Sequence, residues 1–152
     1  MAHQHQNPLA IGKQPTQRQL RVAEEIRHNL ASIFLRGDFT NPELTAWLTN
    51  CSITITNVII SPDLKNAKVY VVPLGEHVSE DGTTLSDQDN KQKLVSLLNE
   101  TAAEIRHFMS KQLTLRYAPQ FRFYHDDTFD QAQRINDLIE EAIRRDKNIP
   151  SD

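Results

Sequence analysis

The side chains best suited to catalysis or metal binding lack the spacing that such sites need. Cys51 is the single cysteine and has no cationic neighbour in sequence, so we interpret it as a structural thiol rather than a nucleophile. His107 and His125 belong to no HExxH or CxxC pattern, which argues against a metal centre. The four glycines are isolated, which excludes a phosphate-binding loop and a dinucleotide-binding fingerprint. Few groups are left from which an enzyme could be built.

A run of acidic residues follows His125 and admits two interpretations. Asp126, Asp127 and Asp130 could hold a hard cation through their carboxylate oxygens. Carboxylates are also favoured at the start of a helix, where they cap backbone N–H groups and interact with the helix dipole, and we prefer that interpretation. A hydrolase using Asp126 and Asp127 with His125 would further need a nucleophile and an oxyanion site, and neither accompanies them. We therefore expect no catalytic residue, no metal and no cofactor.

Basic and aromatic residues are mixed closely between Arg116 and Tyr124. This segment of nine residues holds two arginines and four aromatic residues. Such a mixture suits RNA, because arginine neutralises phosphates and an exposed tyrosine can stack on a base. Phe121 and Phe123 alternate, however, which favours burial of both in the core. Arg122 and Tyr124 then lie on the other face of a strand.

Charge is divided into blocks along the chain, although the net charge is only -3. Residues 1–36 and 93–125 each carry five basic residues against two acidic ones, whereas 37–92 carry three against eight and 126–152 carry four against eight. Two basic segments inside an acidic protein can form a local positive face for a polyanion. The same blocks could be a chance fluctuation on solvated surfaces. Charge alone leaves both alternatives open.

The length of the chain predicts one domain with tails. The protein has 152 residues and a mass of 17.5 kDa, which is an ordinary size for a single domain. Residues 1–15 and 147–152 are expected to be disordered tails, residues 16–146 to form the domain, and residues 75–90 to be a flexible acidic loop within it. No apolar run approaches the ~18 residues of a membrane helix, and no signal or transit peptide is recognisable. We expect a soluble, cytoplasmic protein.

Apolar spacing predicts two helical regions, one near the start of the chain and one in its second half. Thr16 and Gln19 resemble a capping box, and apolar residues then recur at helical spacing up to a glycine stop at Gly37. A second region keeps helical spacing over residues 91–109. A straight helix of that length would match the whole width of a domain of about 30 Å, so we expect a bend near Ala102.

Alternation and β-branched residues predict three strands, at 51–61, 66–74 and 120–126. In the first strand the apolar positions change parity, which predicts a bulge near Asn57. A short turn joins the first two strands, which are expected to form a hairpin. A closing helix is expected to begin near Asp127 or Thr128. The order helix–strand–strand–helix–helix–strand–helix predicts an α+β fold, with a three-stranded sheet and the helices packed on one face.

Four segments, spread over residues 17–143, match a known pattern in order and spacing. They are Arg18-Gln-Leu-Arg21-Val22, Ser61-Pro-Asp63-Leu64-Lys-Asn-Ala67-Lys68-Val69-Tyr70-Val71, Leu115-Arg116-Tyr-Ala-Pro119-Gln-Phe121-Arg-Phe123-Tyr-His-Asp126 and Ile135-Asn-Asp137-Leu138-Ile139. Together they resemble the ribosome-binding factor A family of bacterial small-subunit assembly factors. The resemblance implies a single domain with a type II KH-like fold, in agreement with the order of elements that periodicity predicts.

The resemblance also implies a function. It implies a non-enzymatic ribosome assembly factor that binds the immature small ribosomal subunit and its ribosomal RNA and assists late rRNA processing and maturation. An assembly GTPase is implied as a further partner. We expect a monomer that makes no contact with membranes.

The chain departs from the family pattern at two places. An RNA-binding KH domain carries a GxxG loop between its central helices and the family has a shorter bend with a glycine, whereas the aligned residues here are Thr101, Ala102 and Ala103. Glycine lets the backbone approach a phosphate closely, so its absence argues against RNA recognition by that turn. Thr114 stands where the family commonly has a basic residue, which weakens any RNA contact at that point.

Two functions remain as hypotheses. The first is an RNA-binding assembly factor whose basic face docks on ribosomal RNA. Its expected RNA-binding residues are Arg18, Arg21, Lys65, Lys68, Arg106, Lys111, Arg116 and Arg122. The alternative is a KH-like protein-interaction module that holds a basic protein partner through its acidic loop and C-terminal helix.

Overall fold

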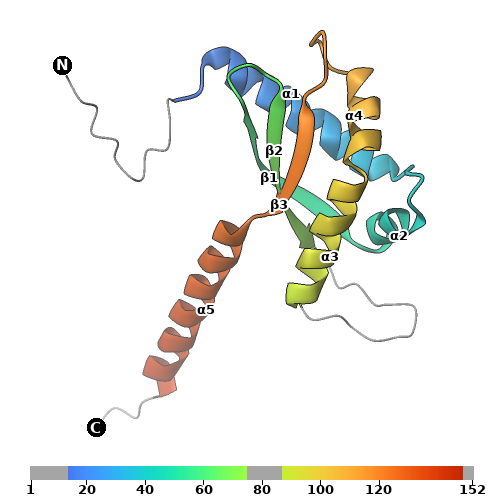
Figure 1. The fold of residues 1–152 in the computed structure, drawn as a ribbon. Helices are drawn as coiled ribbons and strands as arrows, with labels where there is room; N and C mark the ends of the chain where they lie inside the picture. The colour runs from blue at the N-terminus through green and yellow to red at the C-terminus, as the bar shows by residue number, and fades with distance from the viewer. Residues whose placement is uncertain (1–13, 75–86, 149–152) are drawn as a thin grey trace, which may run out of the picture.

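The computed structural model describes residues 14–74 and 87–148, and within them it contains five helices and three strands (Figure 1). Along the chain these are α1 (Gln17–Arg36), α2 (Pro42–Asn50), β1 (Ser52–Ile60), β2 (Asn66–Leu74), α3 (Asp87–Glu100), α4 (Ala102–Ser110), β3 (Gln120–His125) and α5 (Asp127–Asn148). The α+β class and the three-stranded sheet are confirmed. Most of the predicted tails, 1–15 and 147–152, and of the predicted loop 75–90 lies outside the described residues.

The three strands form one mixed sheet in the order β1-β2-β3. β1 pairs antiparallel with β2, as the predicted hairpin requires, and β3 lies parallel to β2. Along β2, Ala67, Val69 and Val71 are buried, whereas Asn66 and Lys68 are exposed. One side of the sheet is therefore covered. We call the uncovered side, which carries Asn66 and Lys68, the open sheet face.

The predicted bulge in β1 is confirmed. The register between β1 and β2 shifts between Ile55 and Asn57. Because one extra residue is accommodated there, the apolar residues before and after the shift point to the same side. Ile55, Val58 and Ile60 are all buried, although their positions in the sequence change parity. The bulge thus keeps a single apolar face along the strand.

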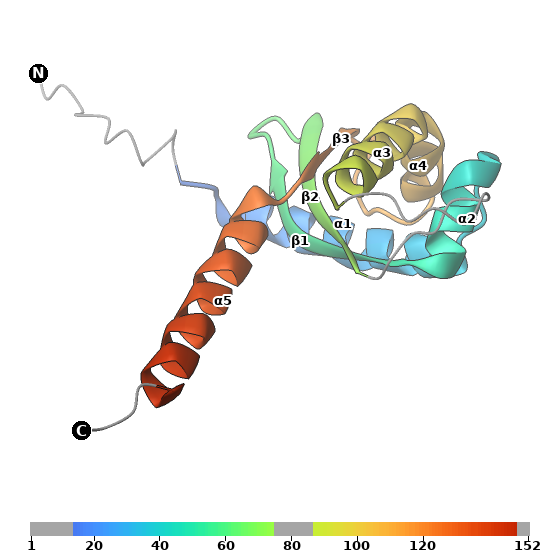
Figure 2. The ribbon, with the colours of Figure 1, turned by 90° about the horizontal axis from the view of Figure 1, so that it is seen from below.

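Helices α1, α3 and α4 cover the buried side of the sheet (Figure 2). α1 packs on β1, and α3 and α4 pack on β3. Ile26 and Leu30 of α1, Leu98 of α3 and Ile105 of α4 are fully buried, and they belong to one hydrophobic core with Val69 of β2. Removal of this apolar surface from water stabilises the helix layer against the sheet.

Both predicted ends of α1 are confirmed. Thr16 Oγ1 accepts a hydrogen bond from the Gln19 N–H at 3.2 Å, and Gln19 Oε1 accepts one from the Thr16 N–H at 2.9 Å, which completes the capping box. The helix ends at Gly37, whose φ of 65° is left-handed and suits glycine. Gln19 Nε2 also donates to the Ile60 carbonyl at 3.0 Å, which fixes the start of α1 against the end of β1.

The bend predicted in the long helical region is confirmed at Thr101, between α3 and α4. The Thr101 hydroxyl donates to the Leu97 carbonyl at 2.7 Å, so it bonds back to the last turn of α3. The turn holds without glycine, because Thr101 has φ -97° and ψ 3°, a conformation open to any residue.

The start of α3 differs from the expected loop 75–90. α3 begins at Asp87, so residues 87–90 are helical, and Asn90 is buried. Their composition is polar and acidic, and the apolar periodicity becomes visible only at Leu94. For this reason the sequence places the helix start too late. Residues 75–86 lie outside the described part of the chain.

One helix, α2, adds to the predicted order. Pro42 is its first residue, and the Asn41 side chain caps it by accepting from the N–H groups of Glu43 and Leu44 at 3.0 and 3.3 Å. Leu44 and Trp47 are 0% and 1% exposed. The helix packs against β1 and α3 and closes the core beyond the end of α1.

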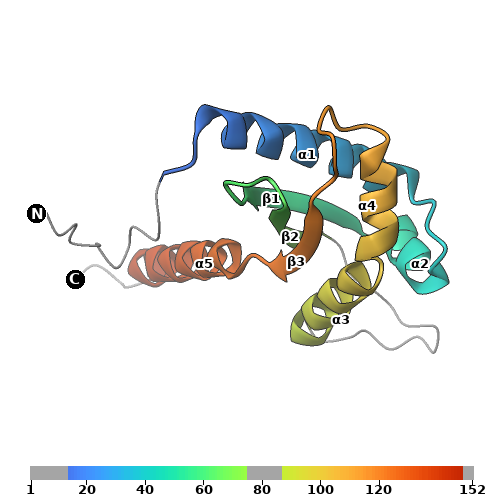
Figure 3. The same cartoon turned by 45° about the horizontal axis from the view of Figure 1, so that its top comes forward.

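α5 is the exception to the expected packing on one face, since it projects away from the rest of the domain (Figures 1 and 3). Its start is as predicted, because Asp126 Oδ1 accepts from the Thr128 N–H at 3.0 Å and caps the helix. Its apolar stripe is exposed, with Leu138 at 64% and Ile139 at 53%. Among the described helices, none has the length and apolar character that crossing a membrane needs.

Candidate functional site

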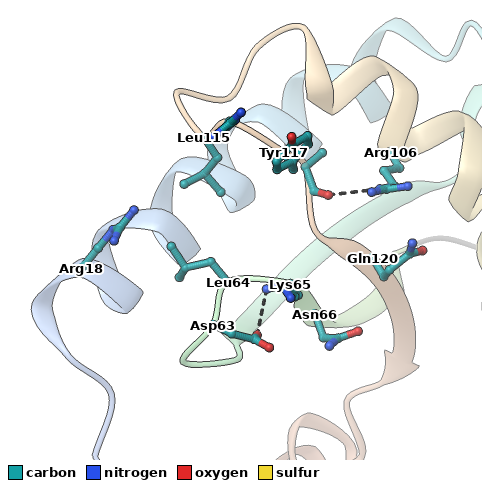
Figure 4. Close-up of a pocket in the computed structure, with 11 residues that line it drawn as sticks. Arg18, Asp63, Leu64, Lys65, Asn66, Arg106, Leu115, Tyr117 and Gln120 are labelled. Atoms are coloured by element: carbon teal, nitrogen blue, oxygen red, sulfur yellow. Dashed lines mark hydrogen bonds between the residues drawn. The ribbon is translucent and has the colours of Figure 1, made fainter.

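A pocket of about 570 Å³ lies at the end of the sheet where β2 and β3 begin (Figure 4). Three segments far apart in the sequence form it: the start of α1, the turn between β1 and β2, and the middle of α4 with the loop before β3. The lining residues are Arg18, Asp63, Leu64, Lys65, Asn66, Arg106, Leu115, Arg116, Tyr117, Ala118 and Gln120. We call it the cationic pocket.

The turn between β1 and β2 is held by its own side chains. The Ser61 hydroxyl donates to Asp63 Oδ1 at 2.6 Å, and the same oxygen accepts from the Lys65 N–H at 3.0 Å. Ser61 Oγ in turn accepts from the Asn66 N–H at 3.0 Å. The hydrogen bond from Ser61 and the one from the Lys65 backbone hold the pKa of the Asp63 carboxyl below its ordinary value. The ionised carboxylate therefore fixes the turn that presents Lys65.

The loop between α4 and β3 is tied to the pocket from two sides. Arg106 Nε donates to the Ala118 carbonyl at 3.1 Å, which joins the loop to α4. The Gln120 N–H donates to the Lys65 carbonyl at 2.8 Å, which joins the start of β3 to the turn. These two bonds hold the guanidinium of Arg106 and the turn with Lys65 at fixed positions on the rim (Figure 4).

Thr114 anchors the same loop to α1. Its N–H and its hydroxyl donate to the two oxygens of the Glu25 carboxylate, at 2.9 and 3.1 Å. The residue that departs from the family pattern is thus engaged with another part of the protein. Its contact with α1 helps to set the path of the loop that carries Arg116.

Positive charge is concentrated in the cationic pocket. Four basic side chains line it, from Arg18, Lys65, Arg106 and Arg116, against the single carboxylate of Asp63. The Asp63 carboxylate is occupied by the hydrogen bonds of its own turn. A cleft with this excess of one sign attracts an anion and raises its local concentration.

Apolar and aromatic surface accompanies the charge. Leu64 and Leu115 line the pocket and pack against the core. Tyr117 is 71% exposed, and the Arg116 guanidinium lies 5.4 Å from the centroid of its ring. A ligand with a flat ring and a negative charge would find both an aromatic face and cations there.

A second pocket, of about 300 Å³, adjoins the cationic pocket. It shares Arg106, Arg116 and Tyr117 with it and extends to His107 and Ala103. Ala103 is the second residue of α4 and follows the break at Thr101 closely. The cationic surface therefore extends to the first turn of α4.

The structure brings together half of the predicted RNA-binding set. Arg18, Lys65, Arg106 and Arg116 line the cationic pocket. The other four lie elsewhere. Lys68 and Arg122 are exposed as register partners on the open sheet face, Lys111 lines a different pocket beside the C-terminal end of α1, and Arg21 is exposed on α1.

Sequence reasoning gave no role to three polar lining residues, Asn66, Tyr117 and Gln120. Asn66 and Gln120 meet because β2 and β3 are register partners at their first residues. No local sequence pattern predicts a parallel pairing between segments so far apart. For Tyr117 a signal was present, because it belongs to the segment that mixes basic and aromatic residues.

The residues considered for catalysis are buried or make local contacts. Cys51 is 4% exposed, and burial raises the pKa of its thiol. Asp126 caps α5, and His125 Nδ1 lies 3.2 Å from Asp127 Oδ1. Within residues 14–74 and 87–148, no three His, Cys, Asp or Glu side chains are placed to hold a metal ion. The side chain of Asp130 is outside that description.

The fold and the site together define a small α+β domain with a cationic pocket where two parallel strands begin. Residues 18–139 match the family model described as ribosome-binding factor A. Since this match spans most of the chain, the protein belongs to the ribosome-binding factor A family.

Relatives named ribosome-binding factor A match almost the whole chain, which confirms the resemblance stated from four segments. The protein of Paracoccus denitrificans is 43% identical over 142 residues, covering 93% of this chain and 91% of the relative. That of Paramagnetospirillum magneticum is 39% identical over 135 residues, covering 88% of this chain and 84% of the relative. The crystal structure of ribosome-binding factor A from Thermus thermophilus covers 70% of this chain and 93% of its own, with a TM-score of 0.48 and 16% identity.

Proposed function

We propose that this chain is a non-enzymatic assembly factor that binds the immature small ribosomal subunit through its ribosomal RNA and assists late rRNA processing and maturation. Membership of the family supports a ribosome-binding role. The cationic pocket supplies a surface suited to RNA. In this proposal the protein acts as a monomer in the cytoplasm, and an assembly GTPase is a further partner.

One observation carries the proposal: four cations from separate segments converge on one pocket. Arg18 comes from α1, Lys65 from the turn, Arg106 from α4 and Arg116 from the loop before β3. Gathering like charges costs Coulomb energy in the free protein, and a bound anion offsets that cost. Phosphate contacts of this kind supply affinity that falls as salt rises.

The tethers described above favour RNA binding by limiting the ordering that binding requires. Arg106 is already oriented by its bond to Ala118, and Lys65 stands on a turn fixed by Asp63. Side chains and loops held in place before binding lose less conformational entropy when a ligand arrives. The exposed ring of Tyr117 adds a face on which an unpaired base can stack.

A factor of this kind needs no catalytic group. If it binds one arrangement of the immature RNA more tightly than another, it shifts the population toward that arrangement by the difference in binding free energy. Release follows when the mature subunit no longer presents the preferred arrangement. The action proposed here is therefore differential binding.

Cosedimentation tests the proposal directly. We expect the purified chain to sediment with immature small subunits, to bind mature ribosomes weakly, and to dissociate as salt is raised, because phosphate contacts release counterions. Binding that ignores salt, or that is equal for mature and immature particles, would contradict it.

A second candidate function, the holding of a basic protein partner, is favoured by the exposed stripe of α5. Ile135, Leu138, Ile139 and Ile143 are 49–64% exposed on a helix that projects from the domain. An amphipathic helix can dock its apolar side in the groove of a partner. Residues 127–148 carry six acidic and four basic residues, so the partner would have a basic rim. Most of the acidic loop of this hypothesis, residues 75–86, lies outside the described residues.

Replacing Leu138 with glutamate separates the two candidates. Because Leu138 is 64% exposed, Leu138→Glu is expected to change the free energy of unfolding by less than about 0.5 kcal/mol, measured by thermal melts. If RNA docking dominates, Leu138→Glu binds small subunits as well as its matched control Asn136→Glu, which adds the same charge beside the stripe. A loss confined to Leu138→Glu would favour the protein-partner function.

A further inference from the structure

Three pairs of side chains follow the parallel strands β2 and β3 across the open sheet face. The register partners are Asn66 with Gln120, Lys68 with Arg122, and Tyr70 with Tyr124. These positions alternate with buried residues in both strands, so their side chains share the uncovered side. Successive pairs are about 6.6 Å apart along the strands. We call these six residues the β2–β3 ladder.

The middle pair of the ladder is cationic and accessible. Lys68 and Arg122 are both exposed and stand on neighbouring strands, which are about 4.8 Å apart. The β1 residue beside Lys68 is the uncharged Ile59, which is 49% exposed. Two cations at this spacing repel each other, and a phosphate placed between them would accept hydrogen bonds from both.

The third pair is a stack of two tyrosines. The ring centroids of Tyr70 and Tyr124 are 5.5 Å apart, with 27° between the ring planes, and both residues are half-buried. β3 is an edge strand, so Tyr124 is the outer member of the stack. It lines a pocket of about 400 Å³ together with Lys91 and Ser96 of α3 and with Asp127, which forms the acidic end of the pocket. A flat base fits against an aromatic ring in such a place.

The ladder is continuous with the cationic pocket and has a defined end. Asn66 and Gln120 line that pocket, so the first pair of the ladder forms part of its wall. At the other end, Asp126 and Asp127 follow β3 directly. Negative charge there disfavours the passage of further phosphates. The surface is thus a path of limited length, from the cationic pocket to the pocket beside Tyr124.

We propose that the β2–β3 ladder binds a short unpaired segment of RNA, with the RNA backbone on Lys68 and Arg122 and a base stacked on Tyr124. This inference rests on the proposed function, because it takes the polyanion in the cationic pocket to be RNA. The tyrosines indicate an unpaired segment, since bases inside a duplex are covered by their neighbours and offer no free face. The ladder therefore selects single strands, whereas the charge of the pocket alone does not discriminate.

Binding of the full-length chain to a fluorescently labelled oligouridine of about eight nucleotides tests the inference; single-strand sites cover lengths of this order. Tyr70→Leu with Tyr124→Leu removes the rings and keeps apolar volume. It is expected to weaken binding about fivefold or more and to leave the salt dependence unchanged, because stacking involves no charge. The matched pair Tyr70→Phe with Tyr124→Phe keeps both rings and should bind within about twofold of the native chain.

A second variant keeps the test independent of any folding defect caused by loss of the half-buried tyrosines. Lys68→Gln with Arg122→Gln changes exposed residues only. It should lower the slope of log affinity against log salt by about 1.4, that is about 0.7 for each lost phosphate contact with a single strand. Tyr70→Leu with Tyr124→Leu is expected to bind an RNA duplex of the same length as well as the native chain does.

The outcomes separate this inference from the proposed function. The leucine and glutamine variants could keep native affinity for oligouridine while Arg18→Glu with Arg116→Glu loses it. That result would overturn the role of the ladder and leave the proposed function standing. A native chain that binds neither oligouridine nor small subunits would overturn the proposed function. Equal losses for single strand and duplex in the leucine variant would overturn the preference for unpaired RNA.

Discussion

Replacing Arg18 and Arg116 with glutamate is expected to weaken binding to small subunits at least about tenfold. The two side chains reach the cationic pocket from α1 and from the loop before β3, so both attractions become repulsions. Each lost phosphate contact should remove about 0.7–0.9 from the slope of log affinity against log salt, and two contacts about 1.4–1.8. Arg106 is left in place because its Nε holds the Ala118 carbonyl. Sedimentation over a series of salt concentrations measures both quantities.

The matched control is Arg144→Glu with Arg145→Glu, which changes the net charge by the same amount on α5. Both residues are exposed, and Arg145 already donates to Glu141 at 2.8 Å. We expect the control to bind within about twofold of the native chain, because α5 lies outside the cationic pocket. Circular dichroism verifies that both variants are folded. Equal losses in the two variants would mean that net charge governs docking. Unchanged binding in Arg18→Glu with Arg116→Glu would favour the second candidate function, the holding of a basic protein partner by α5.

The positions of Arg116 and Arg122 show which features of the site could be predicted from the sequence and which could not. They lie in the same basic segment, yet Arg116 lines the cationic pocket and Arg122 stands on the open sheet face. Local composition was enough to identify the segment, because charge and aromatic content are local properties. The convergence of particular side chains depends on the pairing of β2 with β3, which begins with the bond from Gln120 to Lys65. A parallel pairing across such a separation has no local pattern.

Among the elements of the fold, too, features set by adjacent residues were predictable and features set by distant contacts were not. The capping box at Thr16, the bulge before Asn57 and the break at Thr101 each depend on a few adjacent residues, and each was predictable. The surroundings of α5 were not, because periodicity shows which side of a helix is apolar and not what that side meets. α2 is nine residues long with two buried residues, which is too short a stripe to stand out from a loop.

Replacing Trp47 with alanine is expected to lower the free energy of unfolding by about 3–5 kcal/mol. Trp47 is 1% exposed and lies on α2, which packs against β1 and α3, so truncation leaves a cavity where three elements meet. In a chain of this size each kcal/mol shifts the melting midpoint by about 2–4 °C, so the midpoint should fall by roughly 10 °C. Circular dichroism is the suitable measurement, because Trp47 is the single tryptophan and its fluorescence is lost with it.

Two further variants and one binding measurement test whether the effect of Trp47→Ala is confined to stability. Trp47→Phe keeps an aromatic ring and should cost less than Trp47→Ala, whereas Leu35→Ala removes a side chain that is 88% exposed and should shift the stability by less than about 0.5 kcal/mol. α2 follows the C-terminal end of α1, and Arg18 lies at the other end of that helix of 20 residues, about 30 Å away at the usual rise per residue. Folded Trp47→Ala should therefore bind RNA with native affinity and salt slope. A midpoint as high as that of Leu35→Ala would show that α2 adds little to the core, and a loss of RNA affinity in the folded variant would show that α2 also shapes the cationic pocket.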